Sequence, residues 1–362
     1  MKLHVFNPEH DIALAHNDKY FTAPRAGRIL REDCGFLPAL WAEEGDFVLV
    51  NDISKSEKGL LNIPETYRKR AQNIRFITLQ NLRRLPADIA VEPWGWDSAL
   101  CFQLSRNGFS DKVLPDEASL NEIRALSNRR FSSIVLRELR RRIDPYGDFT
   151  VGESQYVSNV DDLFSAIESN HHSVLKEPWS SSGRGVRYVG DVIDEPTTNW
   201  IKNIINSQEG IMVEPWYDKV CDFGMEFLSD NDGVHYRGLS LFETENGFYI
   251  GNIIASEAKK ERAMSQYLST DKLDLLRSTI ESLLNPYLSK MYKGPLGVDM
   301  MIVRSKEESL RLHPMVEINL RRTMGHVAIE LSKEHHESTA TMRIVYENKQ
   351  YHMLVEPSSI QL

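Results

Sequence analysis

The sequence predicts an α/β fold of more than one domain. Strand-type and helix-type segments alternate along the first third, strand-type segments dominate the middle third, and a hairpin pattern occurs near residue 350. At roughly 150 residues per domain, a length of 362 residues indicates two or three domains. The alternation in the first third predicts a parallel sheet, because parallel strands are joined by crossover helices.

Three strands are expected in the first domain, at residues 3–7, 47–51 and 88–92. A helical stretch at 24–44 separates the first two strands, and residues 97–107 have helical spacing after the third.

Polar residues gather where the first and third of these strands end. The two stretches are Asn-Pro-Glu-His-Asp at 7–11 and Glu-Pro-Trp-Gly-Trp-Asp at 92–97. Because ligands of parallel sheets bind outside the carboxyl ends of the strands, these stretches are candidates for a substrate pocket. The alternative interpretation is that they cap helices and shape turns.

The remaining elements are expected to mix both types. One long helix or two short helices cover 119–143, and Asn159 is placed to cap a further helix. The Arg140-Arg141-Arg142 run is interpreted as a solvated helix face rather than a nucleic-acid site. Further expected elements are a strand at 154–157, a helical block at 256–291, strands at 298–304 and 312–320, and a hairpin at 342–346 and 351–355.

Composition argues against several classes of protein. Lysine plus arginine number 43 against 52 aspartate plus glutamate, and the net charge of −9 disfavours binding to nucleic acid or anionic membranes. No apolar run approaches the roughly 18 residues of a membrane helix. Three scattered cysteines support neither a disulfide framework nor a CxxC metal site, so a cytoplasmic protein is expected. Walker P-loop, HExxH, GxSxG and GxGxxG motifs are absent.

The first segment that carries chemistry is a strand that delivers Lys176 to a loop of small residues. Such a loop lets backbone N–H groups approach phosphate oxygens, and the lysine adds a positive charge. Taken alone, the segment is equally an ordinary hairpin turn. The small residues of the loop are Ser180, Ser181, Ser182, Gly183 and Gly185.

The second segment is an apolar strand that ends in Glu214-Pro215-Trp216, with Asp222 shortly after it. The strand ends in a carboxylate and a turn that proline stiffens, and this end could present backbone groups to the edge of an adenine. Taken alone, the segment is simply a buried strand.

The third segment combines a strand carrying Asp299 with a strand that leads into Arg321. Glu317, Asn319 and Arg321 alternate along the chain, so they point to one face of the strand. Carboxylate and amide oxygens suit Mg²⁺ bridging nucleotide phosphates, and the arginine suits an anion. The alternative is an exposed polar face with a salt bridge.

Taken in order, these three segments resemble the ATP-grasp superfamily. The resemblance covers residues 119–331 and implies an ATP-grasp domain at 119–334, with a small lid subdomain at about 150–215. Residues 1–118 resemble the Rossmann-like pre-ATP-grasp domain of such enzymes, and residues 335–362 are expected to form a C-terminal β-hairpin extension.

The resemblance implies nucleotide contacts for the first two segments. Lys176 would contact the α- and β-phosphates, and the loop at 180–185 would close over them. Glu214 and the backbone at Trp216 would hold the adenine amino group, and Asp222 would hold the ribose.

The resemblance implies a metal and substrate site for the third segment. Asp299, Glu317 and Asn319 would bind Mg²⁺, for which Mn²⁺ can substitute. Arg321 would bind a substrate carboxylate or the oxygens of an acyl phosphate.

Two departures from the superfamily pattern stand out. Where many members carry a first ATP-binding lysine, this chain has Arg129 and Arg130; we expect Arg129 to make the phosphate contact, with Arg130 as the alternative. Asp299 and Glu317 are 18 residues apart, a long interval that a charged turn at 304–309 accounts for.

The resemblance implies an ADP-forming carboxylate–amine ligase. It would use ATP and magnesium to convert a small-molecule or peptide carboxylate into an acyl phosphate for attack by an amine or similar nucleophile. Lys176 and Arg321 would neutralise charge on the transferring phosphoryl group. The alternatives are a phosphotransferase acting on a hydroxyl and a non-catalytic nucleotide-binding protein.

Small molecules are the expected partners, and a homodimer is considered because many members of the superfamily are dimers. The acceptor site is expected among residues 7–11, 94–97 and 242–252. Arg322 and His326 lie near the metal strand, although His326 equally suits a role in capping the helix that follows it.

Overall fold

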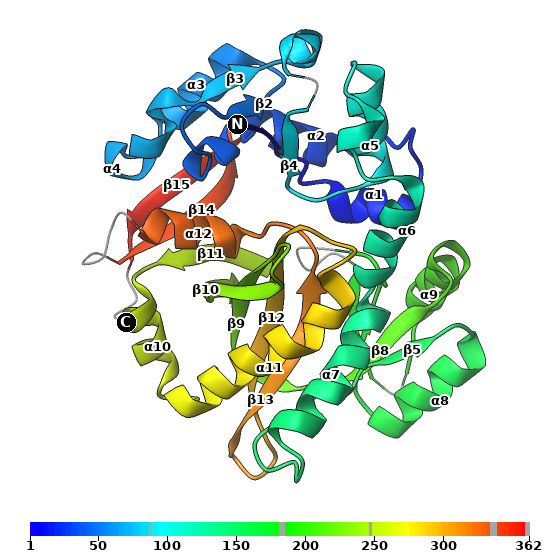
Figure 1. Cartoon of the computed structure of the whole chain (residues 1–362). Helices are drawn as coiled ribbons and strands as arrows, with labels where there is room; N and C mark the ends of the chain where they lie inside the picture. Colours follow the sequence, from blue (N-terminus) through cyan, green and yellow to red (C-terminus); the bar gives the residue numbers. More distant parts are fainter. Residues whose placement is uncertain (87, 181–184, 191, 246–247, 334–338, 359–362) are drawn as a thin grey trace.

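The computed structural model describes residues 1–86, 88–180, 185–190, 192–245, 248–333 and 339–358. Three sheets organise the chain: a parallel sheet at the N-terminus, a small antiparallel sheet, and a large antiparallel sheet (Figure 1). This mixture confirms the predicted α/β class.

The N-terminal sheet has the strand order β3-β2-β1-β4, with every pair parallel. The three predicted strands are present as β1, β2 and β4, but the prediction missed a fourth strand, β3, which comes between β2 and β4 in the sequence and lies at the edge of the sheet. β3 has only three residues, of which Arg75 is exposed, so no periodic pattern marks it. The strands are β1 (Lys2–Val5), β2 (Phe47–Leu49), β3 (Arg75–Ile77) and β4 (Ala90–Pro93).

Short helices connect these strands. The predicted helical stretch at 24–44 is a helix, α2, followed by a separate 3₁₀ turn, η1, in which proline occupies the second position. The helical segments are α1 (His10–His16), α2 (Arg25–Asp33), η1 (Leu37–Leu40), α3 (Ile53–Leu61), α4 (Glu65–Arg68), η2 (Lys69–Asn73), η3 (Leu79–Arg84), α5 (Ser98–Arg106) and η4 (Asp111–Val113).

The small sheet forms a separate unit with its own core, and we call it the lid. Its strands β5 (Gln155–Val157), β6 (Ser173–Lys176), β7 (Val186–Val189) and β8 (Ile211–Pro215) pair in the order β5-β8-β6-β7. Helices α8 (Val160–Asn170) and α9 (Glu195–Gln208) cover it, and Asn159 caps α8 as predicted. Buried Leu163, Leu175 and Ile201 belong to the core between them.

The large sheet has the strand order β13-β12-β9-β10-β11-β14-β15. Asn128 caps α7, so residues 119–143 contain two helices rather than one. α7 packs against β13 and α11, and α12 packs against β9, β10 and β11. The elements are α6 (Glu117–Leu126), α7 (Arg129–Ile143), β9 (Asp218–Ser229), β10 (Val234–Glu245), β11 (Phe248–Ile254), α10 (Glu257–Met264), α11 (Thr270–Leu288), β12 (Gly294–Arg304), β13 (Leu310–Asn319), α12 (Met324–Ser332), β14 (Ala340–Glu347) and β15 (Gln350–Pro357).

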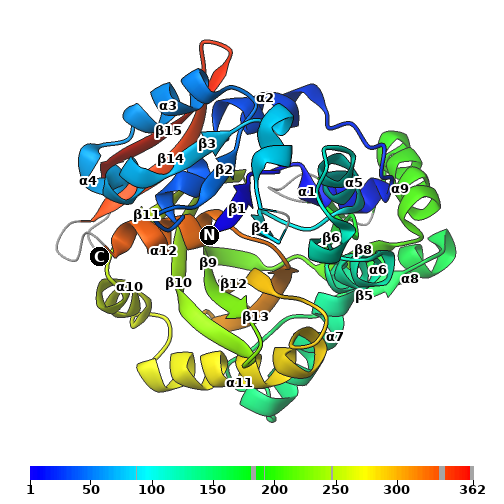
Figure 2. The same ribbon diagram turned by 45° about the horizontal axis from the view of Figure 1, so that its top comes forward.

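The β14–β15 hairpin joins the large sheet to the N-terminal region. β14 pairs with β11, and α2 packs against β15; the hairpin lies below the N-terminal elements in Figure 1 and behind them in Figure 2. Phe36 and Leu37 share one hydrophobic core with Val327, Met342 and Met353. In the described part of the chain, no helix is long and apolar enough to cross a membrane.

Candidate functional site

Lys176 ends β6 in the lid and faces a carboxylate on the neighbouring strand. Its Nζ lies 2.5 Å from Oε2 of Glu214 on β8, and Ser154 donates a hydrogen bond of 2.9 Å to the other Glu214 oxygen. Both charged side chains are almost fully buried. A buried ammonium group with a single carboxylate partner keeps donors available for an anion.

A backbone hydrogen bond joins the two ends of the small-residue loop. The Glu177 N–H donates to the Gly185 carbonyl at 2.8 Å, which closes the base of the loop. Gly185 has a φ of +69°, and a Cβ there would lie 2.7 Å from the Glu177 carboxyl carbon, so only glycine fits. Ser181, Ser182 and Gly183 lie outside the described residues.

Arg129, the first residue of α7, binds the start of this loop. Its guanidinium donates to the Ser180 hydroxyl at 2.7 Å, to the Ser180 carbonyl at 3.0 Å and to the Glu177 carbonyl at 2.6 Å. The same group lies 2.7 Å from Oε2 of Glu317 on β13. Arg129 therefore links the lid to the acidic strand, whereas Arg130 is exposed and takes no part in this contact.

Trp216 and Asp222, the other expected nucleotide contacts, lie beyond the lid strand β8. The Trp216 N–H donates to the His172 carbonyl, and its side chain is 57% exposed. Asp222 lies on β9 with an oxygen 2.5 Å from Lys219 Nζ. The Trp216 amide N–H is thus already engaged by the lid.

Asp299 and Glu317 are direct partners across β12 and β13, so their carboxylates lie on one face of the sheet. Asn319 donates its amide N–H to Asp299 at 2.9 Å. Burial, together with the Glu317 and Glu226 carboxylates, raises the pKa of Asp299 to about 7. A divalent cation would relieve this repulsion, so the donor set fits Mg²⁺.

The three predicted metal ligands include only two carboxylates, and their oxygens already accept hydrogen bonds from protein groups. Among the described residues, no three His, Cys, Asp or Glu side chains form a metal-binding group, and the third predicted ligand is the amide of Asn319. The Asn319 oxygen accepts a hydrogen bond of 2.9 Å from Arg321, and one Glu317 oxygen accepts from Arg129.

Arg321 follows β13 and links the predicted metal ligands to the N-terminal region. Its Nε lies 2.9 Å and 3.1 Å from the two carboxylate oxygens of Asp11 on α1. The pKa of Arg321 is raised, because the attraction of Asp11, Glu317 and Asp299 outweighs the effect of burial. The predicted residues of the third segment are therefore in mutual contact.

A buried polar cluster lies next to the acidic strands. Glu226 on β9 accepts a hydrogen bond of 2.7 Å from Thr323 and lies 2.9 Å from Nδ1 of His326. His326 closes a capping box with Thr323 at the start of α12, and its Nε2 faces the Phe227 carbonyl. The capping interpretation of His326 is confirmed.

His313 on β13 was not singled out by the sequence. It is 1% exposed, and neither ring nitrogen has a hydrogen-bond partner among the described residues. Burial lowers its pKa to about 4, and the nearby Glu214 carboxylate only partly opposes this effect. A histidine in a strand of mixed polarity carries no sequence signal that distinguishes it from a core residue.

The two polar stretches of the N-terminal domain meet at the carboxyl edge of the parallel sheet, as predicted. Asn7 donates to Asp97 at 3.0 Å, and His10 lies 3.3 Å from the same oxygen. A pocket of about 670 Å³ opens beside them. Glu9 lines it, pairs with Arg31 at 2.8 Å, and keeps a second buried oxygen without a partner among the described residues.

Cations outnumber carboxylates in the lining of this pocket. Lys19, Arg28, Arg31 and Arg106 line it against Glu9, Glu32 and Asp97, and Tyr20 and Phe102 add aromatic faces. We call this space the N-terminal pocket. Glu9 and Asp11, two residues apart at the start of α1, connect it to Arg321.

No protein-family model and no curated protein matches the sequence. Among solved structures, N5-carboxyaminoimidazole synthetase from Staphylococcus aureus, complexed with ADP, is similar at a TM-score of 0.50 and 13% identity, over 96% of this chain and 83% of that chain. A putative ATP-grasp superfamily protein from Archaeoglobus fulgidus matches at a TM-score of 0.46 and 14% identity, over 99% and 100% of the two chains. The first likeness shows that the predicted fold is correct.

Proposed function

We propose that this chain, which has the ATP-grasp fold, is an ATP- and magnesium-dependent ligase. It activates a small-molecule or peptide carboxylate as an acyl phosphate. An amine or similar nucleophile then displaces the phosphate, so that the products include ADP and phosphate.

Three groups of charged contacts, in the lid, between the lid and the large sheet, and between the large sheet and α1, carry this proposal. Lys176 pairs with Glu214 in the lid, Arg129 joins Ser180 to Glu317, and Arg321 joins Asn319 to Asp11. Transfer of a phosphoryl group needs cations around its oxygens, because negative charge develops there in the transition state. Lys176, Arg129 and Arg321 would supply three such cations.

In this proposal the lid and α7 hold the nucleotide. Lys176 and Arg129 bind its phosphates, and the loop that Gly185 closes keeps water from the reacting groups. Glu214 and Asp222 contact its base and ribose.

Asp299, Glu317 and Asn319 would hold the magnesium ion, which would neutralise phosphate charge when bound. Arg321 orients the substrate carboxylate or the acyl phosphate that forms from it. The N-terminal pocket holds one of the two small-molecule substrates, since its guanidinium groups suit an anionic group and the unpartnered Glu9 oxygen suits a cationic one.

The test is to measure ADP and inorganic phosphate released from Mg-ATP in the presence of pooled carboxylates, with and without pooled amines. The proposal predicts phosphate release that requires both pools and that Asp299→Asn and Arg321→Gln abolish. ADP formation without free phosphate would identify a phosphotransferase instead. A matched variant, Asp218→Asn on an exposed part of β9, should retain the wild-type rate.

A further inference from the structure

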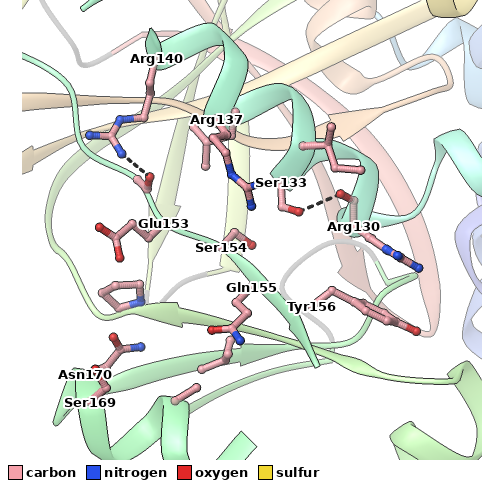
Figure 3. Close-up of a pocket in the computed structure, with 16 residues that line it drawn as sticks. Arg130, Ser133, Arg137, Arg140, Glu153, Ser154, Gln155, Tyr156, Ser169 and Asn170 are labelled. Atoms are coloured by element: carbon pink, nitrogen blue, oxygen red, sulfur yellow. Dashed lines mark hydrogen bonds between the residues drawn. The ribbon is translucent and has the colours of Figure 1, made fainter. Parts of the chain in front are cut away.

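A second pocket lies between α7 and the lid, and we call it the α7 groove. Its volume is about 660 Å³. One wall is α7, and the other is made by residues 152–156, the end of α8 and strand β8 (Figure 3). The groove therefore spans two structural units, since α7 belongs to the core of the large sheet and α8 and β8 to the core of the lid.

The groove is distinct from the candidate nucleotide site. Val213 and Pro215 line it, whereas Glu214 between them pairs with Lys176. Successive side chains of a strand point to opposite faces, so the groove and the Lys176–Glu214 pair lie on opposite faces of β8. Ser154 lies between the two sites, because it lines the groove and donates to Glu214.

Three guanidinium groups from one helix line the groove, against a single carboxylate, Glu153. Arg130, Arg137 and Arg140 are spaced seven and three residues apart, and seven residues correspond to about 10.5 Å along the helix axis. In Figure 3 the Arg137 side chain runs from α7 into the space above Ser154. This concentration of positive charge contrasts with the net charge of −9 of the whole chain.

The partners of these arginines differ from those of their neighbours on α7. Arg141 and Arg142, on the outer side of the helix, both pair with Glu138 at 2.8 Å. Arg140 donates to the Gly152 carbonyl at 2.7 Å, which fixes it at one end of the groove.

The other two arginines of the groove form no ion pair with any residue that the structure describes. Arg130 stacks over the Tyr156 ring, 5.0 Å from its centroid. Arg137 has no hydrogen-bond or ion-pair partner among the residues that the structure describes. The two guanidinium groups are thus available to a ligand.

We infer that the α7 groove is a binding site for a small multivalent anion bearing phosphate or carboxylate groups. The ligand bridges Arg130 and Arg137 on α7, and the side-chain amide of Gln155 on the lid wall supplies a further donor. A volume of about 660 Å³ suits a small molecule rather than an extended nucleic acid. Because the two walls belong to different units, a bound anion also fastens the lid to α7.

The experiment is isothermal titration calorimetry of the full chain, without metal, using tripolyphosphate and citrate as probes of the two anion types. Wild type should bind at least one probe with one equivalent. Arg137→Gln should weaken binding about tenfold, because a charge-assisted hydrogen bond is lost. Arg137 is exposed and has no partner in the described part of the chain, so this variant should fold like wild type.

Two matched variants separate the groove from other anion sites. Arg141→Gln makes the same charge change on the outer side of α7, and Lys176→Met disables the candidate nucleotide site. Arg141→Gln should bind both probes as wild type does. Lys176→Met should lose only binding of tripolyphosphate at the nucleotide site and should keep the binding that Arg137→Gln weakens. The inference is overturned if neither probe binds at about 10 mM, if Arg141→Gln weakens binding as much as Arg137→Gln does, or if only Lys176→Met abolishes binding.

Discussion

Arg321 Nε lies 2.9 Å from Asp11 Oδ2, so a residue after β13 is held by one on the first helix of the chain, 310 positions away. Both side chains are more than four-fifths buried. The ion pair fixes the direction of the guanidinium, whose Nη2 reaches the Asn319 amide oxygen. The N-terminal region thereby positions the arginine that the proposed reaction uses.

Replacing Asp11 with asparagine should slow the proposed reaction without affecting nucleotide binding. Arg321 remains present in Asp11→Asn, but it loses the carboxylate that orients it, so we expect kcat to fall about tenfold. Arg321→Gln should cost at least about a hundredfold, because the cation itself is lost. Steady-state phosphate release and Mg-ADP affinity measure the two effects. An Asp11→Asn enzyme with wild-type kcat would show that the pair has no positioning role.

Mg-ADP should stabilise the folded chain through Lys176 and Glu317. Ligand at about 100 times its dissociation constant adds about 2.7 kcal/mol to the free energy of unfolding. For a chain of this length the melting temperature should rise by a few degrees, roughly 2 to 4 °C. Thermal unfolding with and without Mg-ADP should show this shift in wild type and little or none in Lys176→Met and Glu317→Gln.

Lys176→Met is chosen because it keeps the length of the side chain, although it leaves buried Glu214 without its cation. Lys202→Met, on an exposed position of α9 in the same lid, is its control and should keep the full shift. Equal shifts in wild type and Lys176→Met would remove Lys176 from the nucleotide site.

The free energy of unfolding should depend on pH through His313. Burial lowers the pKa of the folded-state His313 to about 4, below its ordinary value of 6.5, so the unfolded chain takes up this proton first as the pH falls. The stability from neutral His313 is therefore complete above pH 6.5 and is lost as the pH falls towards 4. The loss should amount to roughly 2 to 3 kcal/mol.

Denaturant unfolding of wild type and His313→Met between pH 7 and pH 4 tests this prediction, because the difference between the two chains cancels other titrating groups. The wild-type curve should fall more steeply. Parallel curves would mean that His313 is accessible to protons in the folded state.

The core shared by the N-terminal region and the β14–β15 hairpin should be sensitive to truncation. Met342 is fully buried in this core, so Met342→Ala should lower the free energy of unfolding by about 2 to 5 kcal/mol. Met291→Ala, at a position that is 41% exposed, makes the same chemical change and should cost less than about 1 kcal/mol. Urea unfolding compares the two variants. Similar losses would mean that the hairpin does not contribute to a common core.

The sequence was most informative where the candidate site depends on a local pattern of residues. Lys176 before the Ser/Gly loop and the alternation of Glu317 with Asn319 are short-range signals, and both were read from spacing alone. The sequence did not reveal strand β3, because three residues are too few to show a hydrophobic period.

Other features of the site depend on contacts between distant parts of the chain. The Arg129–Glu317 contact spans 188 positions, and the Asp11–Arg321 contact spans 310. No local pattern encodes such a contact, because the folding of the intervening sheets brings the partners together. The isolation of His313 likewise results from packing and not from its neighbours in sequence.

The core that joins α2 and η1 to the β14–β15 hairpin also has a consequence for biosynthesis. Phe36 and Leu37 are buried partly by Met342 and Met353, which the ribosome adds about 300 residues later. Translation proceeds at about 5 to 20 residues per second, so Phe36 and Leu37 are synthesised roughly 15 to 60 s before these two partners. The nascent chain therefore cannot complete its N-terminal unit while the rest is being translated, and holdase-type chaperones would find their binding surface there.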